Sequence, residues 1–124
     1  MTRKEALAEL IAKVESGDDA GFRLLNRAVF STPCQDMALQ TREEYARYAY
    51  KGSLDAAKAL HEAVLPGWWW DVGIYADTEP MHEASLTRHS EHGEAIDAIQ
   101  AQATTPARAW LLAILRALHS MEAW

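Results

Sequence analysis

Hydrophobic residues in the first part of the chain recur every three or four positions, as they do along one face of an α-helix. A first helix is predicted to begin at Thr2, whose side chain forms a capping box with Glu5, and to end at Ser16-Gly17. Its apolar face comprises Leu7, Leu10, Ile11 and Val14.

A second helix is predicted to begin at Asp18 or Asp19, either of which can cap it, and to stop at Ser31-Thr32-Pro33. Its inward residues are Phe22, Leu25 and Val29. The stretch from 34 to 50 leaves two alternatives open, a short helix that begins at Thr41 or an ordered loop.

A third helix is predicted to follow Ser53, which has the side chain of an N-cap residue. Its spacing turns the following residues toward the core: Leu54, Ala57, Leu60, His61 and Val64. The pair Pro66-Gly67 then makes a turn.

Beyond this turn the period of the pattern falls from about 3.6 to 2, which is the period of a β-strand. One face of the strand is predicted to carry Trp68, Trp70, Val72 and Ile74, and the other face Trp69, Asp71, Gly73 and Tyr75. A second strand is predicted from Met81 to His89. Residues 96 to 103 alternate like a third strand, although residues 94 to 100 could also be helical; we favour the strand.

The last helix has the strongest signals, because Thr105 is a cap residue and Pro106 occupies the first helical position. Its core stripe comprises Trp110, Leu111, Ile114, Leu115 and Leu118, and a second stripe comprises Ala109, Ala113 and Ala117. A helix that is apolar almost all round is buried almost all round. We therefore expect a homodimer, or a higher homo-oligomer, packed through the C-terminal helix along the alanine stripe.

Together these elements predict an α+β fold in one domain, residues 1–124. A small antiparallel three-stranded sheet is packed with N-terminal, central and C-terminal helices, as an α/β/α sandwich.

The net charge of −6 argues against nucleic-acid binding, which depends on neutralising phosphates. A single cysteine, Cys34, excludes an internal disulfide and fits a reducing compartment. The N-terminal residues lack the apolar run of a secretory signal, and no apolar run has the length that a bilayer requires. We expect a cytoplasmic protein without a membrane segment.

Candidate catalytic chemistry is sparse. The histidines His82, His89 and His92, among several acidic residues, resemble a loose metal site, but paired zinc-ligand spacings are missing and a solvated turn is the favoured interpretation. Nucleotide-binding glycine loops and a nucleophile elbow are also missing. The sequence therefore predicts a protein that is not an enzyme and needs neither a metal nor a cofactor.

Arginines and one tryptophan are the better candidates for ligand binding. Arg108 lies in the first turn of the last helix, where a carboxylate is usual, so its guanidinium suits a bound phosphate. Arg23 and Arg27 are four residues apart on the second helix, and Trp69 could stack on a base or a ribose. Solvated surface arginines paired with local acids, and a tryptophan that covers the helices, are the alternatives.

Three segments carry a resemblance to a known family. They are Tyr50-Lys51-Gly52-Ser53-Leu54-Asp55-Ala56-Ala57, Leu65-Pro66-Gly67-Trp68 and Thr105-Pro106-Ala107-Arg108-Ala109. In order and spacing they resemble the phage ABA sandwich family, over about the last three-fifths of the chain. The section between His92 and Thr104 is longer and less regular than in that family.

The resemblance implies a phage or prophage protein. Some proteins similar to this family are Thoeris anti-defence sponges, which sequester a cyclic nucleotide immune signal of the cyclic ADP-ribose type without cleaving it. For this chain it implies ligand binding by Arg108, Arg27, Arg23, Trp69 and His92 between subunits, in the cytoplasm of a bacterial host. The alternatives are an accessory protein or inhibitor that binds a host protein, such as a nuclease or CRISPR component, and a small phosphodiesterase.

Overall fold

The computed structural model describes residues 1–30, 37–76 and 81–122, and arranges them as five helices and one three-stranded antiparallel sheet. The elements in chain order are α1 (Arg3–Ser16), α2 (Phe22–Phe30), α3 (Met37–Tyr50), α4 (Leu54–Val64), β1 (Trp69–Ala76), β2 (Met81–His89), β3 (Ala95–Ala103) and α5 (Pro106–Met121). The predicted α+β fold is confirmed. Within residues 34 to 50, where a helix and a loop were both open, the structure has a helix from Met37 to Tyr50. The favoured third strand is confirmed as Ala95–Ala103.

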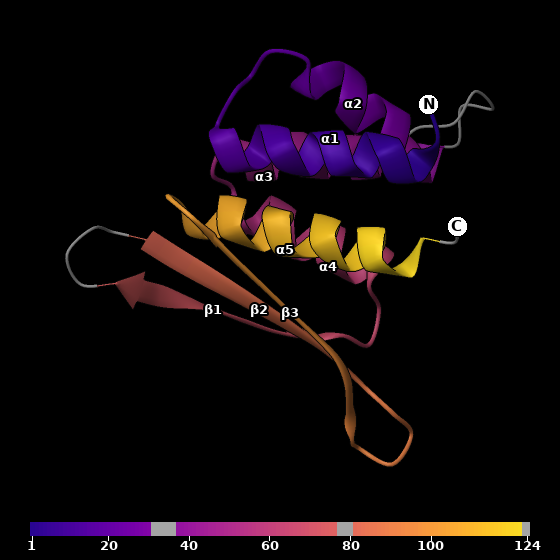
Figure 1. Cartoon of the computed structure of the whole chain (residues 1–124), viewed down its shortest axis with the longest axis vertical. Coiled ribbons are helices and arrows are strands. Elements are labelled where there is room, and N and C mark those ends of the chain that lie inside the picture. Colours follow the sequence, from indigo (N-terminus) through magenta and orange to yellow (C-terminus); the bar gives the residue numbers. More distant parts are fainter. Residues whose placement is uncertain (31–36, 77–80, 123–124) are drawn as a thin grey trace.

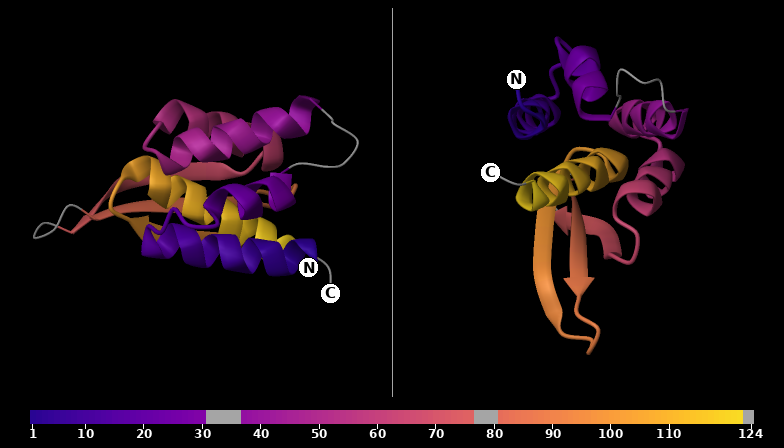
Figure 2. Two further views of the ribbon diagram at one scale, coloured as in Figure 1. Left: turned by 90° about the horizontal axis from the view of Figure 1, so that it is seen from above. Right: turned by 90° about the vertical axis from the view of Figure 1, so that its right-hand side faces the viewer.

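The described helices lie on one side of the sheet (Figure 1, Figure 2). α5 packs directly on the strands and contacts α1, α3 and α4 with the rest of its surface, while α1, α2 and α3 form the outer layer. The order of layers is therefore helix, helix, sheet, which differs from the predicted α/β/α order. The other face of the sheet can stay uncovered because it carries polar side chains, namely Asp71, Glu83, Gln100 and Gln102.

Capping positions agree with the sequence at three helices. The hydroxyl groups of Thr2, Ser53 and Thr105 accept the backbone N–H of the residue three positions later, each at 3.1 Å. The prediction for α2 was wrong, because the Asp18 carboxylate instead accepts the backbone N–H of Ala20 at 2.8 Å and forms a turn before the helix begins. Ser31-Thr32-Pro33, the predicted stop of α2, and Cys34 lie outside the described residues.

α5 forms the centre of the core. Ala109, Ala113 and Ala117 are completely buried within a single chain, as are Leu111 and Ile114. A small protein can thus enclose this helix without a second subunit, because α1, α3, α4 and the sheet surround it. The alanine stripe is not available as a dimer surface, and the predicted dimer through this helix loses its structural reason.

A buried histidine joins α4 to α5. The Trp110 indole N–H donates to His61 Nδ1 at 3.2 Å, so the proton of the neutral imidazole is on Nε2, which donates to the Trp68 carbonyl at 3.0 Å. His61 is 2% exposed, and burial lowers its pKa below the ordinary 6.5, against smaller opposite effects of the Trp68 carbonyl and Glu62. Both ring nitrogens are therefore satisfied in the uncharged form.

Leu54, which was predicted to face the core, and two residues on one predicted face of β1 are exposed. Leu54 is 44% exposed, and on β1 Trp70 and Ile74 are 45% and 74% exposed. The predicted alternation of faces holds, since the Trp70 ring contacts the Trp110 ring of α5 in a tilted arrangement, with 4.4 Å between ring centroids. The cover is incomplete because α5 lies mainly over β2 and β3, leaving β1 at the margin.

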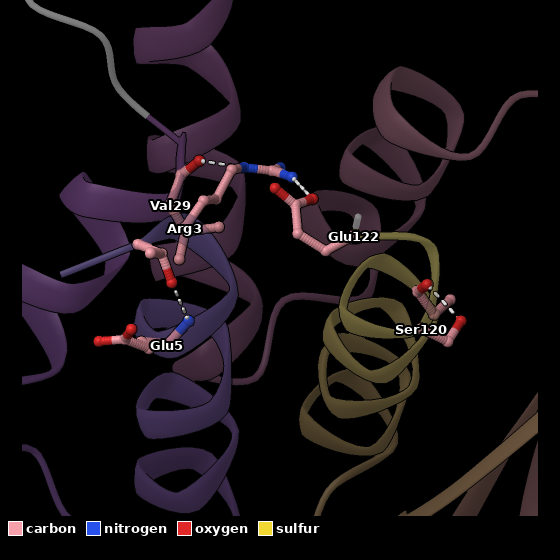
Figure 3. Close-up of polar contacts among 7 residues, drawn as sticks. Arg3, Glu5, Val29, Ser120 and Glu122 are labelled. Atoms are coloured by element: carbon pink, nitrogen blue, oxygen red, sulfur yellow. Dashed lines mark hydrogen bonds and ion pairs between the residues drawn. The ribbon is translucent and has the colours of Figure 1, made fainter. Parts of the chain in front are cut away.

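Arg3 links the two ends of the described chain to α2 (Figure 3). Its Nη1 donates to Glu122 Oε2 at 2.7 Å, and its Nε donates to the Val29 carbonyl at 3.4 Å. No helix among the described residues is long and apolar enough to cross a bilayer.

Candidate functional site

A hollow of about 440 Å³ lies where the first turns of α2 and α5 meet the last turn of α3. We call it the basic pocket, and its lining residues are Asp19, Phe22, Arg23, Arg47, Tyr50, Lys51 and Arg108. Its volume is within the range of small-molecule sites, about 300–1,000 Å³.

Positive charge dominates this pocket although the chain as a whole is acidic. Four cationic side chains and one carboxylate line it, while the net charge of the protein is −6. Within the described ranges, none of Arg23, Arg47, Lys51 and Arg108 forms an ion pair. Cations without carboxylate partners attract an anionic ligand, and low-dielectric walls strengthen that attraction.

Arg108 has a structural role in this arrangement. Its Nε and Nη2 donate to the Tyr50 carbonyl at 3.2 and 3.1 Å, and its guanidinium lies over the Tyr50 ring at 4.3 Å. These contacts join the start of α5 to the end of α3, whose last carbonyl groups lack helical partners. They explain why a cation occupies a helix start.

Gly17 makes room for Arg108. A Cβ atom on Gly17 would lie 3.4 Å from Arg108 Nη1, and the φ of Gly17 is 70°, a conformation that L side chains rarely adopt. The residue that ends α1 thus lies in close contact with the guanidinium beside the pocket.

Tyr50 forms part of the pocket wall, and its ring stacks on Phe22 at 4.2 Å. Burial raises the pKa of Tyr50 above its usual value; Arg108 lowers it, and Asp19 raises it further. The hydroxyl is therefore protonated at neutral pH. Although Asp19 is near, this buried hydroxyl has no hydrogen-bond partner of good geometry among the described residues.

The predicted ligand residues separate into two groups. Arg108 and Arg23 meet in the basic pocket. Arg27 instead faces Glu43, with 3.7 Å between Nε and Oε1. Trp69 lies on the uncovered face of the sheet, where its ring contacts His89 at 4.3 Å, and His92 is exposed in the turn between β2 and β3. The structure does not bring these three residues to the pocket.

Five lining residues were not predicted as ligand residues, namely Asp19, Phe22, Arg47, Tyr50 and Lys51. Basic residues in the last turn of a helix are ordinary because they complement its dipole, so their spacing gives no warning of a site. The Tyr50-Lys51 pair was noted only as part of the family resemblance. Only the packing of α3 against α2 and α5 shows that these side chains share a hollow with Arg108.

The histidine-rich region does not converge on a metal position. His82 is on the helix-facing side of β2, while His89 contacts Trp69 on the uncovered face. In the part of the chain that the structure describes, no three His, Cys, Asp or Glu side chains lie close enough to hold a metal ion.

A second hollow, of about 410 Å³, separates the start of α1 from the end of α5 and is lined by Thr2, Arg3, Lys4, Glu5, Ala8, His119 and Glu122. Its charges largely compensate one another, as the Arg3–Glu122 ion pair shows (Figure 3). It lacks the excess of cations that distinguishes the basic pocket.

Comparison with known proteins yields no match: no family model, no curated protein and no solved structure matches this chain. The resemblance to the phage ABA sandwich family thus stays a prediction.

Proposed function

We propose that this protein binds a small phosphate-bearing molecule in the basic pocket and releases it unchanged. The observation that carries the proposal is the cluster of Arg23, Arg47, Lys51 and Arg108 around one hollow in a chain of net charge −6. A ligand with two phosphates could contact several of these cations at once, and guanidinium forks bind phosphate oxygens in pairs.

The resemblance described above suggests the ligand, a cyclic nucleotide immune signal of the cyclic ADP-ribose type. Its pyrophosphate suits the four cations. A protein that sequesters such a signal in the cytoplasm of a bacterial host would suppress anti-phage defence on behalf of a phage or prophage. The proposal for Arg108 changes in one respect. Its guanidinium already donates hydrogen bonds to the Tyr50 carbonyl, so it holds the wall of the pocket in place as well as adding positive charge to it.

The more accessible cations give the cleaner test. We expect Arg23→Gln and Lys51→Gln to weaken ligand binding about tenfold or more each, the effect of losing one charge-assisted hydrogen bond. Arg27→Gln is the matched control, because Arg27 is on the same helix but pairs with Glu43 and does not line the pocket. Isothermal titration with cyclic ADP-ribose isomers, cyclic dinucleotides and pyrophosphate measures the affinities.

Thermal unfolding provides an independent measurement. A ligand at one hundred times its dissociation constant stabilises the folded protein by about 2.7 kcal/mol. If no compound of this panel binds or stabilises the protein, the proposed function is wrong. Binding of pyrophosphate alone, without preference for a nucleotide, would retain the pocket but reject the cyclic signal.

Recovery of the ligand separates binding from catalysis. The protein is incubated with the bound nucleotide, denatured, and the nucleotide is analysed by mass spectrometry. Sequestration predicts that all of it is intact. A cleaved product would instead support the phosphodiesterase alternative.

The uncovered face of the sheet favours a second candidate function, an accessory protein or inhibitor that binds a host nuclease or CRISPR component. Trp69 is 68% exposed on this face. Inhibition of such an enzyme by the wild-type protein, lost in Trp69→Ser but kept in Arg23→Gln, would support this candidate over ligand binding.

A further inference from the structure

The two edges of the sheet differ in how they are protected. β1 and β3 are the edge strands, since each pairs only with β2. At β3, Arg116 of α5 donates from Nη1 to the Gln100 carbonyl at 2.8 Å and pairs with Glu15. Among the described residues, no side chain makes a comparable bond to the free edge of β1. One backbone carbonyl of β3 thus has a side-chain partner from α5, whereas β1 has no such contact among the described residues.

Apart from a β-bulge between Ile74 and Ala76, β1 lacks the usual devices against strand pairing. Natural edge strands carry lysines, prolines or inward charges that prevent another strand from adding. The sequence of β1, from Trp69 to Ala76, contains neither lysine nor proline, and its only charged residue is Asp71. A strand with this composition and a free row of backbone N–H and C=O groups is a template for another strand.

Exposed apolar side chains gather on this same strand. Trp69 is 68%, Trp70 45% and Ile74 74% exposed. Trp70 and Ile74 point to the helix side of the sheet, yet α5 covers them only in part because it lies mainly over β2 and β3. An additional strand beside β1 would bury both residues and continue the sheet beneath the helices.

We propose that the partner is a second copy of this chain, whose β1 adds antiparallel to β1 about a two-fold axis at Val72. In this register Trp70 of one copy lies directly opposite Ile74 of the other, twice in each dimer. Aromatic and β-branched residues opposite one another on the same face are favourable cross-strand pairs. The strand is therefore complementary to itself.

Charge supports this register. Two copies of an acidic chain repel one another, and an interface is most stable where few charges meet. With Val72 on the axis, Asp71 of each copy lies opposite Gly73 of the other, so no carboxylate faces a carboxylate. The product is a six-stranded antiparallel sheet with a β3 strand at each end.

The dimer requires neither the basic pocket nor a ligand. It replaces the predicted contact through the alanine stripe of α5, which a single chain already buries. Its test is independent of the proposed function, because the variants lie on β1 and β3 and the measurement uses the protein without ligand.

Sedimentation velocity over a wide range of micromolar concentrations tests the dimer. We expect the wild type to dimerise, and Ile74→Lys to weaken dimerisation about tenfold or more by placing a charge opposite Trp70. Ile96→Lys is the matched control, an equally polar change at an exposed position on β3, and should dimerise like the wild type. Far-UV circular dichroism checks that both variants are folded.

Amide hydrogen exchange on the wild type locates the contact without a mutation. Half of the β1 amides already bond to β2; we expect the other half to become protected as protein concentration rises, while amides of β3 do not change. A monomeric wild type would overturn the proposal. So would a dimer that Ile74→Lys leaves intact, or one whose β1 amides exchange as fast as in the monomer.

Discussion

α5 and β1 are both rich in large apolar residues, but they have opposite environments. α5 is enclosed on all sides within one chain: Leu111, Ala113 and Ile114 have no exposed surface. β1 has the same kind of side chains, yet Trp69 and Ile74 are mostly exposed. The difference shows that an apolar pattern identifies the face of an element but not how much of that face its neighbours cover.

Matched truncations should produce the largest contrast. Leu111→Ala leaves a cavity in the centre of the core and should lower the free energy of unfolding by about 2–5 kcal/mol. Ile74→Ala removes a similar side chain from a position that is exposed in the single chain, so at concentrations where the protein is monomeric it should change this free energy by about 0.5 kcal/mol or less. Urea unfolding of both variants measures the difference. Equal losses would mean that β1 is covered in solution, as the proposed dimer requires at concentrations where it forms.

Matched tryptophan substitutions should give the next largest effect. Trp110→Phe removes the N–H that donates to His61 and leaves a buried nitrogen unsatisfied, so we expect a loss of about 1–3 kcal/mol. Trp70→Phe keeps an aromatic ring on a half-exposed site and should cost about 1 kcal/mol or less. Thermal and urea unfolding report both values. A neutral Trp110→Phe would show that the indole N–H contributes little to the core.

A pH dependence should give the smallest effect. Because burial lowers the pKa of His61, the unfolded chain binds its proton first as the pH falls. The contribution of neutral His61 is complete above pH 6.5 and decreases as the pH falls below that value, with a slope of up to about 1.4 kcal/mol per pH unit.

Unfolding measured at several pH values tests this slope. His61→Leu should remove the His61 part of the dependence, and His92→Gln, at an exposed position, should retain it. Hydrogen bonds from Ala20 and Lys13 lower the pKa of Asp18, so this residue changes its protonation only near or below pH 3.8, its ordinary value. It therefore does not contribute to the pH dependence of stability near pH 6.5. A flat profile in the wild type would show that His61 titrates normally.

The sequence predicted elements better than it predicted the site. Helix caps at Thr2, Ser53 and Thr105 are local signals, so the starts of α1, α4 and α5 were found correctly. Arg108 was found because a cation at the start of a helix is unusual, and Arg23 because it lies four residues before Arg27 on the same helix. Arg47 and Lys51 were missed, since a basic residue at the end of a helix has an ordinary explanation.

Local chemistry alone thus determined where helices and strands form, because capping, glycine conformation and the period of the apolar pattern act over a few residues. Tertiary structure decided everything that depends on residues far apart in the chain. It placed the start of α5 against the end of α3, so that the guanidinium of Arg108 donates to the carbonyl of Tyr50, 58 residues away. The basic pocket forms beside this contact. Tertiary structure also centred α5 over β2 and β3 and left β1 open, since one helix is too narrow to cover three strands.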